Sequence, residues 1–520
     1  APVRRVKFLV GQATVREFDI ELATDGKPDF WATADVSAFR GKKLAVEVLL
    51  PPDVKLSALA VPSDKWADAG RLYQEKHRPL FHFTSRTGWL NDPNGLVFAN
   101  GEWHLFYQHN PFGREWGNMH WGHATSTDLF RWKEQGIALY PKKYGDWAFS
   151  GSAVVDTANT SGWGTKEKPP LVLAYTSTGR GECIAFSTDN GKTWTEHDQN
   201  PVVKHAGRDP KLIWHEKAKH WVMAVYDEAE KKQWIAFYTS PDLKTWTFAS
   251  RIEGFFECPD LFELPVREVA ADPRLPDARP QRTRWVLYAA DGKYVTGDFD
   301  GKVFKPEHEG KRQLWYGNFY AAQTFDHAPK RRVQIGWAQG VTFPGTAFNQ
   351  QMTVPVELTL HSRGADGGPR LSAAPVSELA SLRDGKPVFE SKPQEVKKPL
   401  VLVEDADALD ISLDVHWRAG GAFTLDVRGT KIVFDPTKWT LTCKGVTVPL
   451  VRDVAPGGGG TVRLRVLVDR GSVEVFTGET ALSAAVVHDE KNRKVEFVPQ
   501  GGLVMVGSAG IYRLKSAWEK

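Results

Sequence analysis

A short phrase recurs through the middle of the chain and constrains its fold more than any other feature. Residues 126–132 read STDLFRW, residues 187–194 read STDNGKTW and residues 240–246 read SPDLKTW, with the tryptophans 62 and 52 residues apart. A related turn, GDFDGKVF, follows at residues 297–304. One hairpin repeated at this period is typical of a β-propeller with four-stranded blades and long loops. The alternative is chance recurrence of Ser/Asp/Gly turns in an all-β protein; we favour the propeller.

The regions on either side of the repeats also alternate apolar and polar residues, as exposed strands do. Both are expected to be β-structured, so the predicted fold is all-β: a small β-sandwich-like domain at 1–72, a propeller at 73–365, a linker at 366–383 and a second β-sandwich at 384–520. The Pro- and Arg-rich residues 264–284 are expected to form a surface insertion. The strands predicted in the two flanking regions are 5–10, 17–22, 30–36, 43–50, 400–403, 409–415, 422–427, 461–468 and 472–476.

Composition excludes several classes of partner. The net charge is +4 over 520 residues, with no basic stripe to neutralise phosphates, so nucleic acid is not an expected partner. No apolar run reaches the ~18 residues that would span a bilayer, so no membrane insertion is expected. The chain holds 20 Trp, 28 Phe and 12 Tyr but only 4 Met, a bias expected where flat rings stack on sugars or fill a β-rich core.

The cysteines and the first residues bear on location. Cys183, Cys258 and Cys443 allow at most one disulfide, which leaves the redox compartment open. The chain starts with Ala1 and Pro2 and carries no signal segment, which indicates a removed leader or a trimmed sequence, and we expect secretion. The oligomeric state stays open.

Three acidic residues stand in distinctive surroundings, each in a different predicted blade. They are Asp92 in WLNDPNG, Asp209 in GRDP and Glu257 in FECPD. Because a propeller brings the first strand of every blade to one axis, these side chains are expected to converge. Hydrolysis of a glycosidic bond needs two carboxyl groups, one protonated to release the leaving oxygen and one ionised to attack carbon or activate water.

The neighbours of these acids predict different protonation states. Pro93 restricts the backbone of Asp92, and nearby amides are expected to keep its carboxylate charged. The flanking residues of Glu257 are apolar or weakly polar, which is expected to favour its protonated form. Each acid alone also has a structural interpretation: a turn for Asp92, a surface ion pair for Asp209 and an exposed loop position for Glu257.

Together these motifs resemble glycoside hydrolase family 32, the β-fructofuranosidases that include invertases, exo-inulinases and levanases. The resemblance spans residues 75–515 and rests on short motifs along that length. It implies a five-bladed propeller joined to a β-sandwich. The motifs are RPLFHF (78–83), GWLNDPNG (88–95), FYQ (106–108), WGHA (121–124), FSGS (149–152), RDP (208–210), ECPD (257–260) and DRGSVEVF (469–476).

The resemblance implies a retaining mechanism that needs no metal or cofactor. Asp92 would be the nucleophile, Glu257 the general acid/base and Asp209 the transition-state stabiliser. Structural alternatives remain for five of the implied substrate contacts: Trp116 and Trp337 as propeller core, Phe149 and Ser150 as an ordinary strand end, and Arg208 as a residue that only orients Asp209. The implied contacts are Asn91, Gln108, Trp116, Phe149, Ser150, Arg208 and Trp337.

The sequence departs from the family in two places. Leu90 replaces the commoner Met, a swap that conserves volume. WYGNFYA at 315–321 lacks acidic residues that many members carry there, which leaves the leaving-group preference open. The N-terminal residues resemble the small β-domain that precedes the catalytic module of some bacterial fructan hydrolases.

The implied substrate is therefore a fructan, levan or inulin, and also sucrose, with fructose released from terminal units. A fructosyltransferase and an endo-acting fructanase are the alternatives among enzymes. A non-catalytic fructan-binding protein is the alternative from another class, although binding alone requires no pair of acids.

Overall fold

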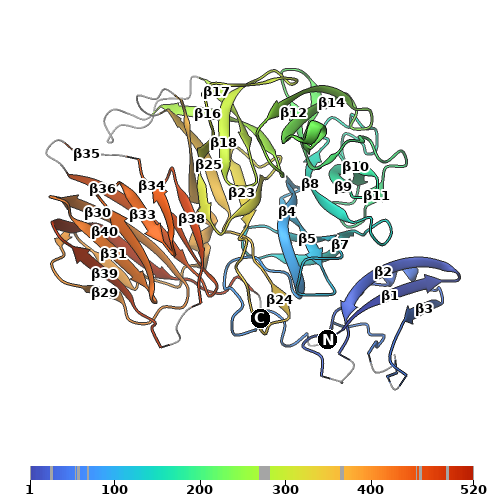
Figure 1. Cartoon of the computed structure of the whole chain (residues 1–520), viewed down its shortest axis with the longest axis horizontal. Helices are drawn as coiled ribbons and strands as arrows, with labels where there is room; N and C mark the ends of the chain where they lie inside the picture. The colour runs from blue at the N-terminus through green and yellow to red at the C-terminus, as the bar shows by residue number, and fades with distance from the viewer. Residues whose placement is uncertain are drawn as a thin grey trace.

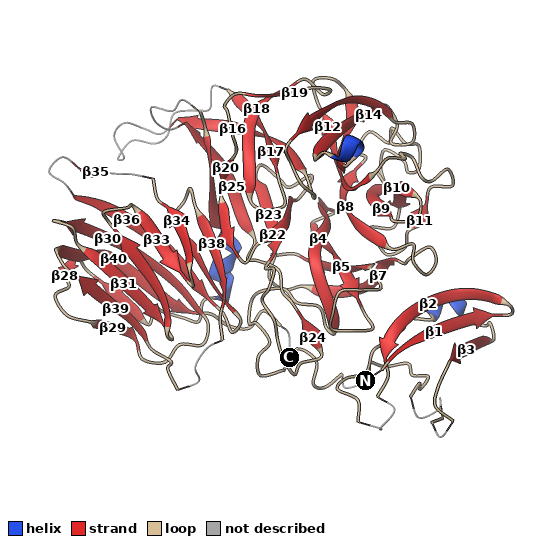
Figure 2. Ribbon diagram, in the orientation of Figure 1, coloured by secondary structure: helices blue, strands red, loops and turns tan. Residues whose placement is uncertain are grey.

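The structure is a computed structural model, and almost all of its regular elements are strands (Figures 1 and 2). It describes residues 2–518 apart from 24–26, 53, 56–58, 67–68, 269–281, 363–367, 452–453, 456–458 and 488–490. The helices in this part are short 3-10 turns, η1 (Ser37–Phe39), η3 (Ala229–Lys231) and η4 (Ser377–Leu382). The all-β prediction is confirmed. No helix in the described ranges combines the length and the apolar character needed to cross a bilayer.

Successive groups of antiparallel strands fill the chain between residues 88 and 375 (Figure 1). In the first four groups the strands pair in chain order, each with the next, except that the last strand of the fourth group pairs with the third strand of that group. The groups are β4 (Gly88–Ala99), β5 (Glu102–Asn110), β6 (His120–Ser126) and β7 (Lys133–Leu139); β8 (Ala148–Val155), β9 (Leu171–Ser177), β10 (Gly181–Ser187) and β11 (Thr195–Glu196); β12 (Gly207–His215), β13 (His220–Asp227), β14 (Trp234–Ser240) and β15 (Thr247–Glu253); β16 (Asp260–Glu268), β17 (Thr283–Tyr288), β18 (Lys293–Phe299), β19 (Phe304–Pro306) and β20 (Arg312–Gln313); and β22 (Tyr320–Thr324), β23 (Arg332–Trp337), β25 (Val356–Ser362) and β26 (Arg370–Pro375).

The first strands of these groups lie next to one another. The strand β4 contacts β8, β8 contacts β12, β12 contacts β16, β16 contacts β22, and β22 returns to β4. A short strand, β24 (Phe348–Asn349), pairs in parallel with the start of β4. This ring is the arrangement that a propeller requires, and it brings residues far apart in sequence to one axis.

The recurring sequence phrase is the turn between the third and fourth strands of a group. In each turn one aspartate Oδ1 accepts hydrogen bonds from two backbone N–H groups that follow it, which holds the chain reversal. The prediction that one hairpin is reused is therefore confirmed. The aspartates are Asp128 between β6 and β7, Asp189 between β10 and β11, Asp242 between β14 and β15, and Asp300 between β18 and β19.

A second repeat, which sequence inspection did not reveal, lies in the first strands. Pairing with the second strand breaks at the same level in four groups, and each break leaves two residues outside the ladder. Bulges of this kind bend a strand and re-aim its side chains, often beside active sites. The unpaired residues are 91–92 in β4, 149–150 in β8, 209–210 in β12 and 321–322 in β22.

Two facing sheets form the C-terminal β-sandwich, and apolar side chains from both make one core. The predicted strands 400–403, 422–427 and 472–476 coincide with observed strands. One sheet contains β21 (Trp315–Gly317), β27 (Phe389–Ser391), β28 (Gln394–Glu395), β30 (Leu409–Arg418), β35 (Val454–Ala455), β36 (Gly459–Val468), β37 (Ser472–Phe476), β38 (Ala481–Ala485) and β40 (Leu503–Arg513); the other contains β29 (Leu400–Val403), β31 (Ala422–Val427), β32 (Thr430–Asp435), β33 (Thr440–Cys443), β34 (Val446–Pro449) and β39 (Val495–Gln500).

The N-terminal region is a three-stranded antiparallel sheet in the order β2 (Ala13–Glu21), β1 (Val3–Val10), β3 (Leu44–Val48). Residues 30–36, predicted as a strand, form none; Ala32 and Ala34 instead pack against the apolar face of this sheet.

The N-terminal sheet docks on the loop between β5 and β6. Phe18 stacks on Phe112 with ring centroids 3.6 Å apart. Asn118 exchanges two hydrogen bonds with the backbone of Asp19, at 2.9 and 2.8 Å. Stacked rings and paired backbone groups together fix the position of this loop.

Two other segment predictions need correction. Part of the predicted linker, residues 370–375, is the strand β26, because it pairs with β25; residues 366–367 lie outside the described part. Of the predicted insertion, residues 264–268 belong to β16, and residues 269–281 are not described.

A buried histidine joins the segment before β4 to the sandwich. His82 Nδ1 lies 2.8 Å from Asp469 Oδ2, and its Nε2 lies 3.3 Å from Glu474 Oε2. The carboxylate of Asp469 also accepts the backbone N–H groups of Leu80 and Phe81. Burial alone would lower the pKa of His82, but the two carboxylates outweigh it and raise that pKa to about 9.

The buried cluster of His82, Asp469 and Glu474 predicts that the stability of the protein depends on pH. Between the usual histidine pKa of 6.5 and about 9, the folded chain holds a proton that the unfolded chain has released. The stabilisation is therefore complete below pH 6.5 and is lost as the pH rises through 9. We expect His82→Gln to destabilise the protein by about 3 kcal/mol at pH 6, because it leaves buried carboxylates unpaired. Urea unfolding at pH 6 and pH 9.5 measures the difference in free energy of unfolding between the parent and this variant. A difference that does not shrink at pH 9.5 would contradict the assignment.

Candidate active site

Asp92, Asp209 and Glu257 converge where the bulged first strands meet. The thiol of Cys258, which follows Glu257, lies 3.7 Å from Asp92 Oδ2 and 3.5 Å from Asp209 Oδ2. One sulfur atom therefore touches carboxylates from β4 and β12 and belongs to the residue next to the third acid. The convergence expected from the sequence is what the structure shows.

Asp92 occupies the bulge of β4, and two donors orient its carboxylate. Ser150 Oγ donates to Oδ2 at 2.6 Å, and Asn91 Nδ2 donates to Oδ1 at 3.0 Å. Burial raises the pKa of Asp92; the two hydrogen bonds oppose this rise, and the charge of Glu257 adds to it. The residue as a whole is part-exposed.

Asp209 lies deeper, with 5% of its residue surface exposed. Its backbone N–H donates to Thr176 Oγ1 at 2.9 Å, and its Oδ2 accepts the backbone N–H of Cys258 at 3.2 Å. Burial, followed by the charges of Asp92 and Glu257, raises the pKa of Asp209 to about 8. Ionising all three neighbouring carboxyl groups at once is energetically unfavourable, because their like charges repel.

The raised pKa of Asp209 predicts a gain in stability when its charge is removed. Between the usual value of 3.8 and about 8, the folded chain holds a proton that the unfolded chain has lost, so stability falls as the pH rises through this window. The loss is at most about 1.4 kcal/mol per pH unit. Asp209→Asn stays neutral, so we expect it to melt at a higher temperature than the parent at pH 8 and at nearly the same temperature at pH 4, while it loses activity. A melting difference that is the same at both pH values would contradict this.

Glu257 lies in the loop before β16, held by two polar side chains from other groups. Arg208 donates to its Oε1 from Nε at 2.9 Å and from Nη2 at 2.6 Å, and Tyr320 OH donates to its Oε2 at 2.7 Å. The expectation of apolar surroundings for Glu257 is wrong, because its sequence neighbours do not surround its carboxylate. Phe256 is exposed, and Cys258 points toward the other two acids.

The backbone is strained at the same residues. Asp209, Glu257 and Cys258 have φ angles of 69°, 49° and 40°, in the left-handed region that side chains other than glycine rarely adopt. Strain of this kind clusters at functional sites, where the surrounding structure holds residues in costly conformations.

The structure places the other predicted contacts around these acids. Asn91 and Ser150 donate hydrogen bonds to the carboxylate of Asp92, and Arg208 donates to that of Glu257. Gln108 is buried, and its Nε2 donates to the backbone oxygen of Ala148 at 2.9 Å, so it supports the strand that carries Ser150.

The predicted aromatic contacts Trp116 and Trp337 pack against neighbours of the acids. Trp116 is 54% exposed, and its ring meets Phe149 edge-on at 5.9 Å, so it is not a core residue. Trp337 is half-buried, with its Nε1 donating to Gln350 Oε1 at 2.9 Å and its ring 6.5 Å from that of Tyr320.

Two residues in contact with the acids were not predicted. In the sequence, Cys258 stands out only as the neighbour of Glu257, and Tyr320 only as part of the segment that departs from the family. The adjacency of Cys258 to Glu257 was a usable signal, whereas Tyr320 lies 63 residues from Glu257 and nothing local links them.

The departing segment 315–321 begins at the junction with the sandwich. Trp315 is buried in β21, which pairs in parallel with β38, and its Nε1 donates to Ser483 Oγ at 3.0 Å. Asn318 Oδ1 accepts the backbone N–H of Ala485 at 2.8 Å. Leu90 is fully buried, as a substitute for Met would be.

The three cysteines are buried and free. Within the described ranges, no group of three or more His, Cys, Asp or Glu side chains has an arrangement that could hold a metal ion.

Comparison with known proteins identifies the family. Residues 82–372 match the model of the N-terminal domain of glycosyl hydrolases family 32, and residues 378–514 match the model of its C-terminal domain. The chain belongs to glycoside hydrolase family 32. The resemblance inferred from the motifs is therefore confirmed, and with it the assignment as a glycoside hydrolase.

Family 32 relatives cover most of the chain. It is 36% identical to a levanase from Bacillus subtilis (strain 168), over 92% of this chain and 76% of the relative. That share exceeds the stretch spanned by the two family models, so the match extends into the N-terminal region. An extracellular exo-inulinase from Aspergillus ficuum is 31% identical over 86% of this chain and 96% of its own length.

Solved family 32 structures agree in fold. The crystal structure of exo-inulinase from Aspergillus awamori superposes with a TM-score of 0.72 at 28% identity, over 86% of this chain and all of that one. A fructofuranosidase from Schwanniomyces occidentalis complexed with fructose gives 0.73 at 26% identity, over 84% and 98% of the two chains.

Proposed function

We propose that this family 32 enzyme is a retaining hydrolase that releases fructose from terminal β-fructofuranosyl units of a fructan. The observation that carries the proposal is the meeting of Asp92, Asp209 and Glu257, from three strand groups, at the thiol of Cys258. A binding protein needs no such cluster, because buried like charges cost stability and add little to recognition of a neutral sugar.

In the first step, an oxygen of Asp92 attacks C2 of the terminal fructosyl unit. The bond from C2 to the leaving oxygen breaks, and Glu257 gives its proton to that oxygen. Ser150 and Asn91 hold the attacking carboxylate in one orientation. The cation of Arg208 stabilises the carboxylate that Glu257 becomes after this transfer.

In the second step, Glu257 takes a proton from water, and the water oxygen attacks C2. The bond between C2 and Asp92 breaks, which releases fructose and restores both acids. Two displacements at one carbon retain its configuration. Asp209, whose pKa burial and the neighbouring carboxylates raise to about 8, can donate to or accept from sugar hydroxyls beside the reacting carbon.

Two observations support the proposed substrate class: the identity of the matched relatives and the exposed aromatic side chains near the acids. A levanase and exo-inulinases are among the relatives that match over most of this chain. Exposed Trp116 and Phe256 offer aromatic faces on which sugar rings can stack beyond the cleaved bond. The matched relatives include an enzyme described as extracellular, which supports secretion of this one.

Chromatography of the products from levan, inulin and sucrose tests the proposal. We expect fructose to be the only small product from the start of the reaction on at least one fructan. Early oligosaccharides would instead show endo cleavage, and trisaccharides that accumulate before fructose at high sucrose would show transfer. No turnover on any of the three would overturn the proposal.

A further inference from the structure

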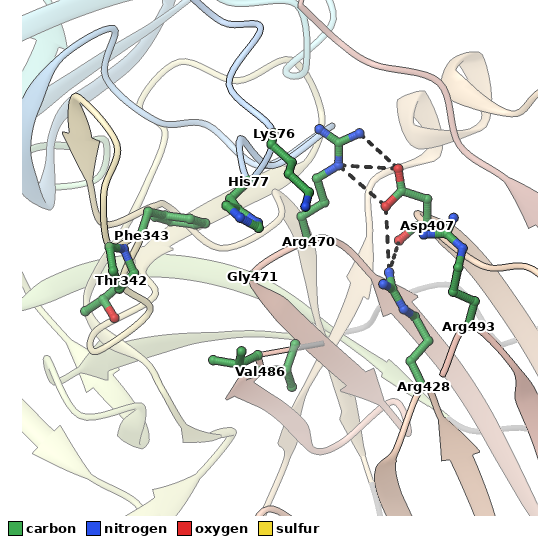
Figure 3. A pocket seen from close by; sticks show the side chains of 12 residues that line it. Lys76, His77, Thr342, Phe343, Asp407, Arg428, Arg470, Gly471, Val486 and Arg493 are labelled. Carbon is green, nitrogen blue, oxygen red and sulfur yellow. Dashed lines mark hydrogen bonds and ion pairs between the residues drawn. The ribbon is translucent and has the colours of Figure 1, made fainter. Parts of the chain in front are cut away.

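A cavity of about 500 Å³ lies at the junction of three parts of the chain (Figure 3). Lys76 comes from the segment before β4, Phe343 from the loop after β23, and Arg428 and Arg470 from the sandwich. The lining includes none of the active-site residues described above. The cavity therefore calls for an explanation independent of the carboxylate site.

Cations dominate the lining. Lys76, Arg428, Arg470 and Arg493 carry permanent positive charges, whereas Asp407 is the single acid among the lining residues that the structure describes. Two guanidinium groups share that carboxylate: Arg470 Nη2 donates to it at 3.0 Å, and Arg428 Nη1 lies 3.7 Å away (Figure 3). Among the described residues these two arginines share one carboxylate, a local shortage of negative charge, whereas Arg493 has its own ion-pair partner in Asp405.

Arg428 shows this shortage most clearly. The residue is 6% exposed and lies in the turn between β31 and β32. Its φ of 53° is in the left-handed region, which is costly for a residue other than glycine. The turn thus holds a cationic side chain in a buried position. Its Nε is buried and has no hydrogen-bond partner among the described residues. Burial, followed by the charge of Arg493, lowers its pKa. A buried guanidinium with an idle donor is destabilising unless an anion accepts from it.

The shape and chemistry favour a multivalent oxyanion. A guanidinium offers paired N–H donors that match two oxygens of one phosphate group. Phe343, Pro344 and Val486 give the same cavity an apolar wall. Its volume exceeds that of one inorganic anion, so the organic part of an ester has room beside this wall.

We propose that this cavity binds a phosphate group between Arg428 and Arg470, carried by inorganic phosphate or by a phosphate monoester of a small polar molecule. The bound group would link two arginines of the sandwich to Lys76, just before the first blade. By mass action it would stabilise the junction between the two parts of the chain. It would not take part in the bond cleavage.

Titration calorimetry of the full chain tests this, with inorganic phosphate, glucose 6-phosphate and sodium chloride at matched ionic strength. We expect saturable binding of phosphate with one site and no comparable signal from chloride. Arg428→Gln and Arg470→Gln should each weaken binding at least tenfold. Arg463→Gln is the matched control, because it removes the same charge from an exposed position on the sandwich.

The outcomes separate clearly. Equal affinities in the parent and Arg428→Gln, or equal signals from phosphate and chloride, would overturn the site. If either arginine variant fails to fold, exposed Lys76→Gln decides: at least threefold weaker binding supports the site, and unchanged binding overturns it. Tighter binding of the sugar phosphate than of inorganic phosphate identifies an ester as the ligand, and the reverse order identifies the free ion.

Discussion

Replacing Asp92 with alanine is expected to lower kcat on fructan about 10⁴-fold or more, with the fold intact. In the proposed mechanism this carboxylate, oriented by Ser150 and Asn91, forms the bond to the reacting carbon, so its loss removes the covalent route. Loss of a nucleophile leaves substrate contacts in place, so KM should change far less than kcat. Steady-state kinetics and far-ultraviolet circular dichroism measure the two parts of this prediction.

A matched control for Asp92 comes from the repeated turns. Asp242 is also a part-buried aspartate, but its carboxylate accepts backbone N–H groups at the turn between β14 and β15. Asp242→Asn should therefore affect stability and leave kcat within a few-fold of the parent. Full activity in Asp92→Ala would remove this residue from the mechanism.

Replacing Glu257 with glutamine is expected to lower kcat on fructan by about 10³-fold, the middle of the range for general acid catalysis. Its effect should depend on the leaving group. With an aryl β-fructofuranoside the leaving oxygen needs little protonation, so the first step survives while attack by water remains slow. The covalent intermediate should then accumulate, and stopped-flow measurement should show a burst of the aryl alcohol.

Glu228 supplies the control for Glu257. It accepts from Nη1 of the same Arg208 at 3.0 Å but lies toward solvent. Glu228→Gln should change kcat by no more than a few-fold and should show no burst. Absence of a burst in Glu257→Gln, with the first step slowed as much on the aryl substrate as on fructan, would argue that this residue only positions Arg208.

The repeats made much of the fold predictable. The phrase ending in Trp132, Trp194 or Trp246 encodes an aspartate that caps a turn, a local interaction that sequence can report. Residues 30–36 were misjudged because alternation alone cannot tell a strand from a segment that packs apolar side chains without pairing. Residues 370–375 were misjudged because a strand next to a linker is defined by its partner β25, which lies earlier in the chain.

The three acids of the site could be predicted from the sequence, but the residues that surround them could not. The three motifs each carry a carboxylate, and the ring of first strands brings them together. The surroundings of Glu257 come instead from Arg208 and Tyr320, which belong to different strand groups. Sequence neighbours cannot report such contacts, since the left-handed backbone at Glu257 and Cys258 turns their side chains in separate directions.

The docking of the N-terminal sheet bears on the proposed stacking of Trp116 against a sugar ring of the substrate. Exposed Trp116 lies on a loop fixed at both ends, by the stack of Phe112 on Phe18 and by the bonds of Asn118 to Asp19. An aromatic ring on a free loop would have to give up its motion each time a substrate arrives. Here that ordering is complete before any encounter, so the entropic cost falls on folding and not on each turnover.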